Sequence, residues 1–311
     1  MNRLWVRVAE MKVLTPVIRE LTLEPVEGAL LPFSSGSHIV LELPLKDRVL
    51  RNAYSLLNDP NDTQHYQIAV RLQEQSRGGS AFVHEQIKVG DRLAISAPLN
   101  LFALHSKAQH HVFIAGGIGI TPFLAHMKYL LHRGGSFELH YACREGISNA
   151  YQEMLLQLFG DRVHLYSNGK RLNVAAVLAD RALHTHVYIC GPETLIEAVQ
   201  QQATALAWSP HRVHWEAFQA PPVGEAFSVQ LRSGRQIDVP SDFSLLEALE
   251  RAEVQVQSLC RGGVCGQCVV QYSAGEIEHH DHFLGDDERQ HALMPCVSRG
   301  KAGQCLQLNL E

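Results

Sequence analysis

Long apolar runs are missing from this sequence. No stretch of about 18 residues is free of glycine, proline or polar breaks, whereas a membrane-spanning helix needs about 20 mostly apolar residues. The first residues mix charged side chains with apolar ones (Arg3, Arg7, Glu10 and Lys12), which is not the pattern of a secretory signal. We therefore expect a protein of the reducing cytoplasm, without a membrane span.

Blocks of like charge are missing as well. The formal net charge is −5, and the sequence has neither the basic block of a nucleic-acid-binding protein nor an acidic, disordered tail. The cysteines number seven, and an odd number without a secretory signal argues against a disulfide framework. What remains is a chain of 311 residues, which is long enough for two or three domains. We expect a monomer.

The 18 histidines do not form a recognisable metal motif. The sequence has no H-x3-H or HExxH pattern, and it lacks the Cys-x-His and Cys-x2-His hooks of a Rieske centre. Pairs such as His110-His111 would point to opposite faces of a strand. We expect most of the histidines at the surface.

Four cysteines near the C-terminus follow the spacing C-x4-C-x2-C-x27-C, and they are Cys260, Cys265, Cys268 and Cys296. This spacing is typical of plant-type [2Fe–2S] proteins, in which four thiolates hold two irons. Glycines within residues 260–268 allow the chain to wrap tightly and to direct backbone N–H groups at the sulfurs. The pattern predicts an iron–sulfur cluster.

A structural zinc site is the alternative for these cysteines. Zinc sites usually have two short cysteine hooks, whereas here one ligand stands alone far downstream. Cys305 competes with Cys296 for the fourth position. We prefer Cys296, which follows Met294-Pro295, because Cys305 begins an alternating run typical of a strand.

Residues 1–103 alternate in period two over 6–8, 21–23, 38–43 and 66–71, with turn residues between these runs. Short strands at such spacing predict an antiparallel β-barrel. One short helix is expected to begin at Ser80 and to end before Val89.

Residues 104–220 alternate between apolar runs and helical segments, which predicts an α/β domain with a parallel sheet. The expected strands are at 111–115, 137–143, 163–166 and 186–190.

Residues 221–311 form a third domain, and a proline-rich linker at 220–225 is predicted where this domain begins. Ser233-Gly234 lies between two alternating segments, which predicts a hairpin, and a short helix is expected at 245–252. This order is that of a compact α+β, β-grasp ferredoxin domain.

Two segments of the barrel indicate a flavin site. Residues 51–56 read Arg-Asn-Ala-Tyr-Ser-Leu and resemble the flavin strand of the ferredoxin reductase superfamily, Arg-x-Tyr-Ser, with Asn52 in place of the arginine. Residues 76–80 read Ser-Arg-Gly-Gly-Ser before a predicted helix, so Arg77 and Ser80 can bond phosphate oxygens.

Two glycine-containing turns indicate a nucleotide site in the α/β domain. Residues 116–122 read Gly-Gly-Ile-Gly-Ile-Thr-Pro between a strand and a helix, where a pyrophosphate can approach the backbone. Cys190-Gly191-Pro192 ends another strand at the edge of the sheet where ligands of α/β proteins bind.

Taken together, the three segments resemble the phthalate dioxygenase reductase family along nearly the whole chain. Within that family, the flavin strand and residues 67–103 look most like the reductase subunits of carnitine monooxygenases, and the reductases of vanillate demethylase and phthalate dioxygenase are similar too. The resemblance implies FMN, a [2Fe–2S] cluster and NADH as cofactors. It implies a Rieske-type oxygenase as the protein partner that accepts the electrons.

The resemblance also assigns roles. Tyr54 would lie against the flavin ring and Ser55 would reach its N5 edge, while Cys190 would lie near the nicotinamide and Phe218 would cover the flavin. The residues assigned to flavin or nucleotide binding are Asn52, Ala53, Tyr54, Ser55, Ala69, Val70, Arg71, Arg77, Gly78, Gly79, Ser80, Gly116, Gly117, Gly119, Thr121, Pro122, Cys190, Gly191, Pro192 and Phe218.

Two rival interpretations stay open. One is a self-contained flavin reductase or monooxygenase whose electrons go to a small acceptor. The other is a non-enzymatic zinc or iron–sulfur module on a degenerate flavin scaffold. The sequence contains no oxygen-activating iron motif, which favours an external partner.

Overall fold

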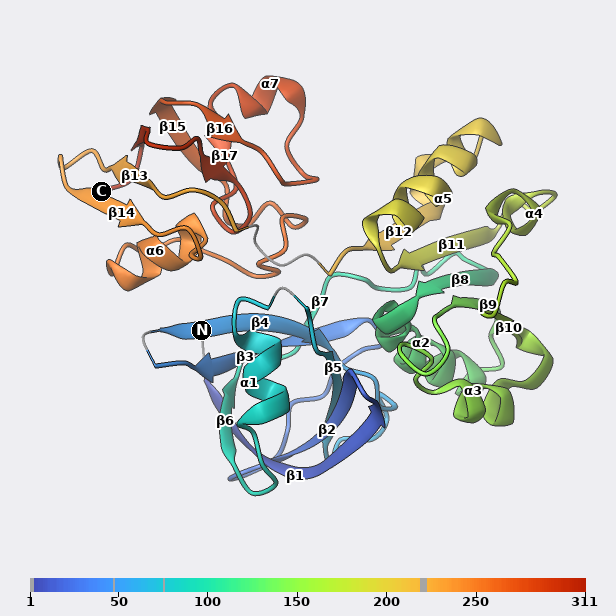
Figure 1. Cartoon of the computed structure of the whole chain (residues 1–311). Helices are drawn as coiled ribbons and strands as arrows, with labels where there is room; N and C mark the ends of the chain where they lie inside the picture. The colour runs from blue at the N-terminus through green and yellow to red at the C-terminus, as the bar shows by residue number, and fades with distance from the viewer. Residues whose placement is uncertain (1–2, 47, 75, 219–222) are drawn as a thin grey trace. The chain divides into compact units, whose positions relative to one another are not determined.

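The computed structural model describes residues 3–46, 48–74, 76–218 and 223–311. The chain separates into two compact units, Met1–Phe218 and Gln219–Glu311, which we describe one at a time (Figure 1). None of the helices in these described ranges has the length and apolarity needed to cross a membrane. The predicted linker at 220–225 lies partly outside the described residues, and the predicted boundary at 103/104 stays a prediction.

The N-terminal part of the first unit is an antiparallel sheet with the order β4-β3-β6-β1-β2-β5, and β7 pairs with β3. The two ends of this order, β4 and β5, lie against each other, so the sheet curls around an apolar core that includes Leu21, Leu41 and Ile68. This confirms the predicted antiparallel flavin-type domain. Its elements are β1 (Leu4–Thr15), β2 (Ile18–Pro25), β3 (Ser37–Pro44), β4 (Val49–Ser55), β5 (Tyr66–Arg71), α1 (Gly79–Glu85), β6 (Arg92–Ile95) and β7 (Leu99–Asn100).

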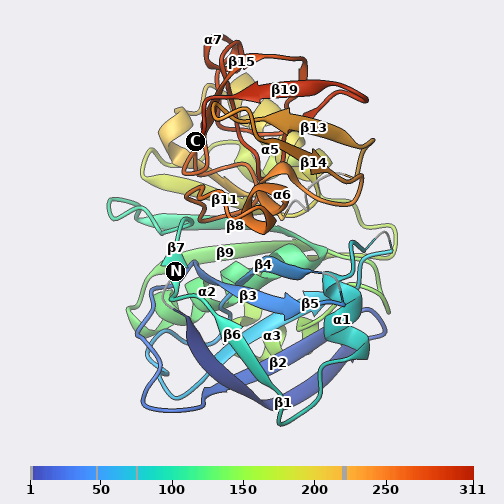
Figure 2. The same cartoon turned by 90° about the vertical axis from the view of Figure 1, so that its left-hand side faces the viewer.

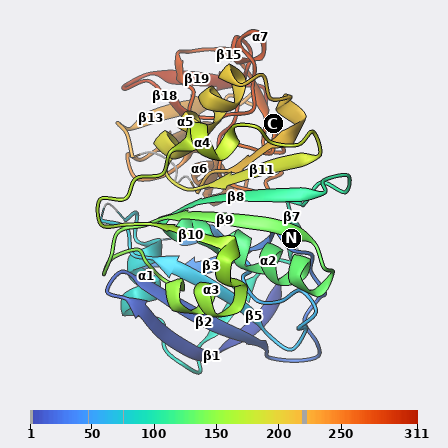
Figure 3. The ribbon, with the colours of Figure 1, turned by 90° about the vertical axis from the view of Figure 1, so that its right-hand side faces the viewer.

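The rest of the first unit is a parallel sheet with the order β10-β9-β8-β11-β12. Helices α2 and α3 cover one face and α4 and α5 cover the other (Figure 3). The strands are β8 (His110–Gly116), β9 (Ser136–Ala142), β10 (Val163–Tyr166), β11 (Thr185–Cys190) and β12 (Val213–Glu216). The helices are α2 (Thr121–His132), α3 (Gln152–Phe159), α4 (Val174–Leu178) and α5 (Glu193–Ala205).

The barrel and the parallel sheet share one apolar core. Ile18 and Phe102 of the barrel pack in the same cluster as Phe113 and Phe123 of the α/β part. Hydrogen bonds cross between the two parts as well: Tyr151 Oη donates to Glu20 Oε2 at 2.8 Å, and Thr15 Oγ1 donates to the Ile147 carbonyl at 2.8 Å. Figure 2 shows the barrel strands beside this sheet. The two parts therefore form one compact body.

The second unit has a mixed sheet with the order β14-β13-β19-β15-β17 and a separate pair, β16 and β18. The Ser244 hydroxyl accepts a hydrogen bond from the Glu247 backbone at the start of α6, which gives the predicted helix its cap. This confirms the predicted ferredoxin-type fold. The strands are β13 (Phe227–Gln230), β14 (Gln236–Val239), β15 (Val270–Ala274), β16 (Ile277–Glu278), β17 (Ala292–Leu293), β18 (Arg299–Gly300) and β19 (Cys305–Leu308); the helices are α6 (Leu245–Arg251) and α7 (Asp286–Arg289).

Several histidines of the first unit are buried rather than at the surface, among them His38 on β3 and His126 on α2. Burial lowers the pKa of His38 to about 4 and that of His126 to about 3. Burial, and then the charges of neighbouring histidines, also lower the pKa of His186 and of His214 to about 4. All four stay neutral in the folded protein at neutral pH.

We predict that acid destabilises the first unit well above pH 4. An unfolded histidine takes up a proton near its ordinary pKa of 6.5, while the folded one resists protonation. The free energy of unfolding therefore falls as the pH drops from 6.5 towards 4, by about 1.4 kcal/mol per pH unit for each such histidine. Denaturant unfolding at pH 7 and pH 5 measures this slope.

His126→Gln should make that slope shallower, whereas His211→Gln, at an exposed position, should leave it unchanged. Equal slopes in the wild type and in His126→Gln would contradict the assignment.

Candidate functional site

The four predicted cluster ligands come together in the second unit as two pairs of thiols. Cys268 Sγ and Cys296 Sγ lie 3.3 Å apart, and both side chains are buried. Cys260 and Cys265 form the other hydrogen-bonded pair. Two thiol pairs, one for each iron, fit a two-iron cluster, so we infer that these four residues would hold it.

Backbone N–H groups surround these sulfurs. The Gly262 N–H points at Cys260 Sγ at 3.4 Å, and the N–H groups of Gly263 and Val264 bond Cys296 and Cys260. Such donors stabilise thiolate charge and tune the potential of an iron–sulfur cluster.

Hydrogen bonding within each pair favours ionisation of one of the two thiols. The hydrogen bond from Cys260 lowers the pKa of Cys265 to about 6, and the hydrogen bond from Cys296 lowers the pKa of Cys268. The same hydrogen bonds, together with burial, raise the pKa of the partner thiols. Iron binds the thiolate form of cysteine.

A salt bridge anchors the first part of the cluster loop. The Arg261 guanidinium donates to both carboxylate oxygens of Glu250 on α6, at 2.7 and 2.8 Å, and it is nearly buried. Sequence reasoning missed this pair, although Arg261 lies between the predicted ligand Cys260 and Gly262. Bidentate geometry makes it a strong contact, which fixes the loop against the helix.

The rival fourth ligand lies elsewhere. Cys305 is exposed at the start of β19, where it pairs with Ser228 of β13. The structure therefore places Cys296, and not Cys305, beside Cys268.

The two flavin segments predicted from the sequence meet in the barrel. Asn52 and Tyr54 lie on the same face of β4, where Asn52 Nδ2 donates to Tyr54 Oη at 3.4 Å. The Asn52 amide also lies against Gly79, where an added Cβ would be 2.4 Å from Nδ2. A larger residue at this position would push the Asn52 side chain away, so the short approach brings β4 and the start of α1 together. Burial raises the pKa of Tyr54 to about 12, and it stays a neutral phenol.

The loop before α1 is held by serine hydroxyls. Ser80 Oγ donates to Ser76 Oγ at 3.0 Å and accepts from the Gln73 N–H at 3.1 Å. Gly78 has a φ of +105°, in the left-handed region. The Arg77 carbonyl accepts from Arg48 Nη2 at 2.9 Å, so two arginines lie at this turn.

Some buried nitrogen atoms of the barrel have no hydrogen-bond partner among the described residues. Two of them are Nε of Arg71, at the end of β5, and Nε2 of His38, which pairs with Ser55 across β3 and β4. Buried donors normally find partners, so these two atoms are candidates to meet a ligand. Arg71 was predicted from the sequence, together with Ala69 and Val70. His38 was not predicted, and it lies on the face of β3 opposite to that of Ile39 and Leu41, whose side chains fill the core.

The two nucleotide turns meet at the carboxyl edge of the parallel sheet. A Cβ on Gly119 would lie 2.2 Å from the Cys190 carbonyl oxygen, and a Cβ on Gly191 would lie 3.0 Å from Gly116 Cα. The backbones therefore touch directly, and glycine is needed for the contact. A 3₁₀ turn at Gly117–Ile120, which the sequence did not predict, leads into α2.

Side chains around this edge are fixed. Thr121 Oγ1 donates to the Ile118 carbonyl at 3.0 Å, and Pro122 lies in the first turn of α2. Burial, and then the nearby Glu216 carboxylate, raise the pKa of Cys190 well above its ordinary value, so this residue stays a thiol. Phe218 is 42% exposed, and its predicted role as a cover of the flavin stays a prediction.

Three family descriptions match successive parts of the chain. Residues 6–103 match "Oxidoreductase FAD-binding domain", residues 96–213 match "Dimethylamine monooxygenase subunit DmmA-like, N-terminal domain", and residues 229–301 match "2Fe-2S iron-sulfur cluster binding domain". The first description names FAD, whereas the sequence led us to expect FMN. A flavin is common to both.

Whole-chain relatives agree with this order. The chain is 57% identical over 297 residues, 95% of each chain, to the heme-dependent oxidative N-demethylase beta subunit of Ectopseudomonas mendocina. It is 46% identical over 314 residues, 98% of each, to the carnitine monooxygenase reductase subunit of Escherichia coli. Among solved structures, phthalate dioxygenase reductase superposes with a TM-score of 0.90 at 32% identity, covering 99% of this chain and 98% of the other.

The fold and the site thus define a flavin-dependent oxidoreductase with its own [2Fe–2S] domain. The chain belongs to the family of phthalate dioxygenase reductase-like proteins, which confirms the resemblance seen in its motifs.

Proposed function

We propose that the protein is an NADH-dependent FMN/[2Fe–2S] reductase that supplies electrons to a separate oxygenase or demethylase component acting on an N-methylated amine. The observation that carries this proposal is the 57% identity to an N-demethylase beta subunit over 95% of both chains. The four paired cysteines supply the one-electron end of the path.

The proposed substrate class rests on three of the matches. The matched names refer to an N-demethylase, to carnitine and to dimethylamine, and all three concern methylated nitrogen. We expected a Rieske-type oxygenase, near carnitine monooxygenase, from the sequence. The higher identity to the N-demethylase subunit favours a heme-dependent demethylase as partner, and the Rieske-type carnitine monooxygenase is the second candidate.

The residues of the barrel would bind and orient the flavin. Tyr54 offers a neutral aromatic face, and Ser55, buried at the end of β4, offers a hydroxyl to the ring edge. Arg77, Ser80 and Asn52 gather at one turn and suit a single phosphate, which supports FMN over FAD. When bound, the flavin supplies the step from two-electron hydride chemistry to single-electron transfer.

The carboxyl edge of the parallel sheet, where the two glycine turns meet, would position NADH. The bare backbone at Gly116, Gly119 and Gly191 lets a pyrophosphate approach the strand ends. Glu145 follows β9 at this edge and hydrogen-bonds Asn168. A carboxylate at that place disfavours the 2′-phosphate of NADPH. In our proposal this effect outweighs the attraction of the neighbouring Arg144 for that phosphate. Initial rates with NADH and with NADPH test the choice.

The first experiment is the visible spectrum of the purified protein, followed by addition of NADH. Flavin and iron–sulfur bands that NADH bleaches support the reductase. A colourless protein that contains zinc would contradict the proposed reductase and favour the non-enzymatic module. Chromatography of the released flavin separates FMN from FAD.

The second experiment adds the partner. Purified protein, NADH and a heme-dependent N-demethylase component should release formaldehyde from an N-methylated amine. A Rieske-type carnitine monooxygenase should be reduced less efficiently. If neither partner is reduced while quinones or ferricyanide are reduced rapidly, the self-contained reductase becomes the better description.

We predict that Arg77→Ala weakens flavin binding without unfolding the barrel. Loss of a charge-assisted hydrogen bond to phosphate costs about 1.5–3 kcal/mol, which is about a 10- to 150-fold rise in Kd for FMN. Fluorescence titration of the flavin-free protein measures this. Arg92→Ala, an exposed arginine on β6, is the matched control and should leave the Kd unchanged. Equal affinity in both variants would place the phosphate elsewhere.

A further inference from the structure

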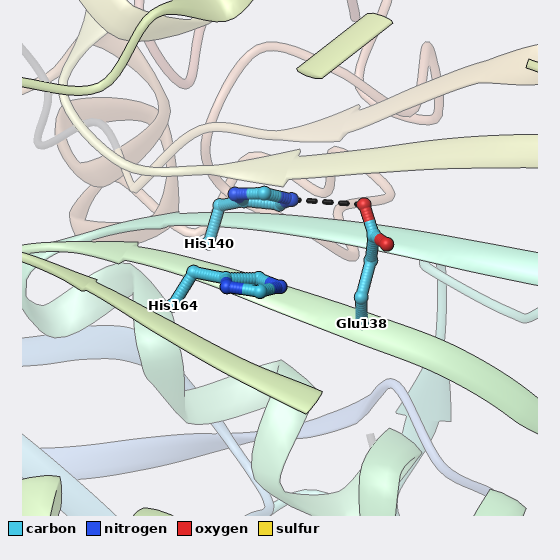
Figure 4. Close-up of side chains that lie close together, drawn as sticks. All are labelled: Glu138, His140 and His164. Carbon is cyan, nitrogen blue, oxygen red and sulfur yellow. Dashed lines mark hydrogen bonds and ion pairs between the residues drawn. The ribbon is translucent and has the colours of Figure 1, made fainter. Parts of the chain in front are cut away.

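Three side chains with metal-binding atoms converge on one face of the parallel sheet. Glu138 and His140 are two residues apart on β9 and so lie on the same face, and His164 pairs with His140 across β9 and β10 (Figure 4). The two imidazole rings are stacked with centroids 4.8 Å apart. No linear motif reveals this group, because its members come from two strands.

The distances suit a small cation. The candidate ligand atoms of the three residues all lie within 4.8 Å of one another, and His140 Nε2 is 2.9 Å from Glu138 Oε1. Tetrahedral zinc, with bonds of about 2.0–2.1 Å, separates two ligand atoms by about 3.3 Å. The His140–Glu138 pair therefore needs to open by only about 0.4 Å. His164 is exposed, so its ring can rotate into the third position.

Outer contacts hold two of the three groups in place. His140 Nδ1 is 2.9 Å from Tyr166 Oη, which fixes the ring and leaves Nε2 towards the site. The Glu138 carboxylate accepts from Arg181 Nη2 at 2.5 Å. Metal ligands in proteins commonly have such a second partner, which orients them.

We propose that Glu138, His140 and His164 form a binding site for a divalent transition cation of the zinc class, with solvent in the fourth position. Two imidazoles and one carboxylate are a ligand set that zinc accepts. The cation would link the edge strand β10 to β9. Because Arg181 already pairs with the carboxylate, the cation competes with a salt bridge, and we expect micromolar rather than nanomolar affinity.

The test uses the full-length protein with flavin and cluster bound, so that the four ligand cysteines are occupied. After treatment with a chelator, equilibrium dialysis against zinc with elemental analysis should give one zinc per chain. His164→Gln should raise the Kd about tenfold or more, and His140→Gln should do the same. His184→Gln, another exposed histidine, is the matched control, and Cys305→Ser removes the exposed thiol as a competing site.

A thermal scan gives a second measurement, since a ligand that binds only the folded state raises the Tm. Zinc should raise the Tm of the wild type and of His184→Gln, but not of His164→Gln. NADH–ferricyanide activity checks that each variant is folded. No zinc uptake, or equal uptake in the wild type and in His164→Gln, would overturn the proposal and leave these residues as a hydrogen-bonded network only.

Discussion

Cys268→Ser is expected to abolish the iron–sulfur cluster while the flavin stays bound. Cys268 is buried with its Sγ 3.3 Å from that of Cys296, so its loss leaves one iron with a single protein thiolate. The flavin site lies in the other compact unit, which has its own core. Iron analysis, the visible spectrum and electron paramagnetic resonance of the reduced protein measure the loss. Serine in place of Cys260, Cys265 or Cys296 should have the same effect.

Cys305→Ser is the control for this series. Cys305 is exposed on β19, away from the paired thiols, so the variant should keep full iron content. The opposite result, with iron lost in Cys305→Ser and kept in Cys296→Ser, would mean that the fourth ligand is wrongly assigned.

A fragment ending at Phe218 is expected to reduce ferricyanide with NADH at close to the full-length rate but to fail with the oxygenase or demethylase partner. The chain divides after Phe218 into compact units, and the fragment keeps the residues proposed to bind flavin and nucleotide. It lacks the four cysteines, and with them the proposed exit for single electrons. Parallel assays of ferricyanide reduction and of partner turnover measure the two outcomes.

Full-length Cys268→Ser is the matched control, because it keeps the second unit but loses the cluster. It should behave as the fragment does in both assays. Normal partner turnover by the fragment would show that the flavin feeds the partner directly. Failure of the fragment alone, with normal turnover by Cys268→Ser, would assign the second unit a docking role without electron transfer.

Features encoded within short segments could be predicted from the sequence. The cysteine spacing predicted which four thiols come together, because three of them lie within nine residues, 260–268. Period-two alternation located strands such as β3 and β5, because the side chains of a half-buried strand alternate strictly between two faces. The glycine turn at 116–119 could be placed at a strand end because it directly follows the apolar run at 111–115.

Features that depend on distant segments could not be predicted. The contact between Asn52 and Gly79 joins residues that are far apart in sequence, and nothing local specifies it. The burial of His126 depends on the barrel packing against α2, where its ring meets Ser35 at 3.0 Å. The Glu138–His140–His164 group needs the register between β9 and β10, which alternation alone leaves open.

The core shared by the barrel and the parallel sheet limits how this protein can be recombined with its relatives. A chimera that joins the barrel of one protein to the nucleotide sheet of another must match Ile18 and Phe102 to Phe113, and must keep the Tyr151–Glu20 hydrogen bond. The cluster unit has a separate core. Under the proposed function we therefore expect that this unit can be exchanged as one segment, whereas the flavin and nucleotide parts must be inherited together.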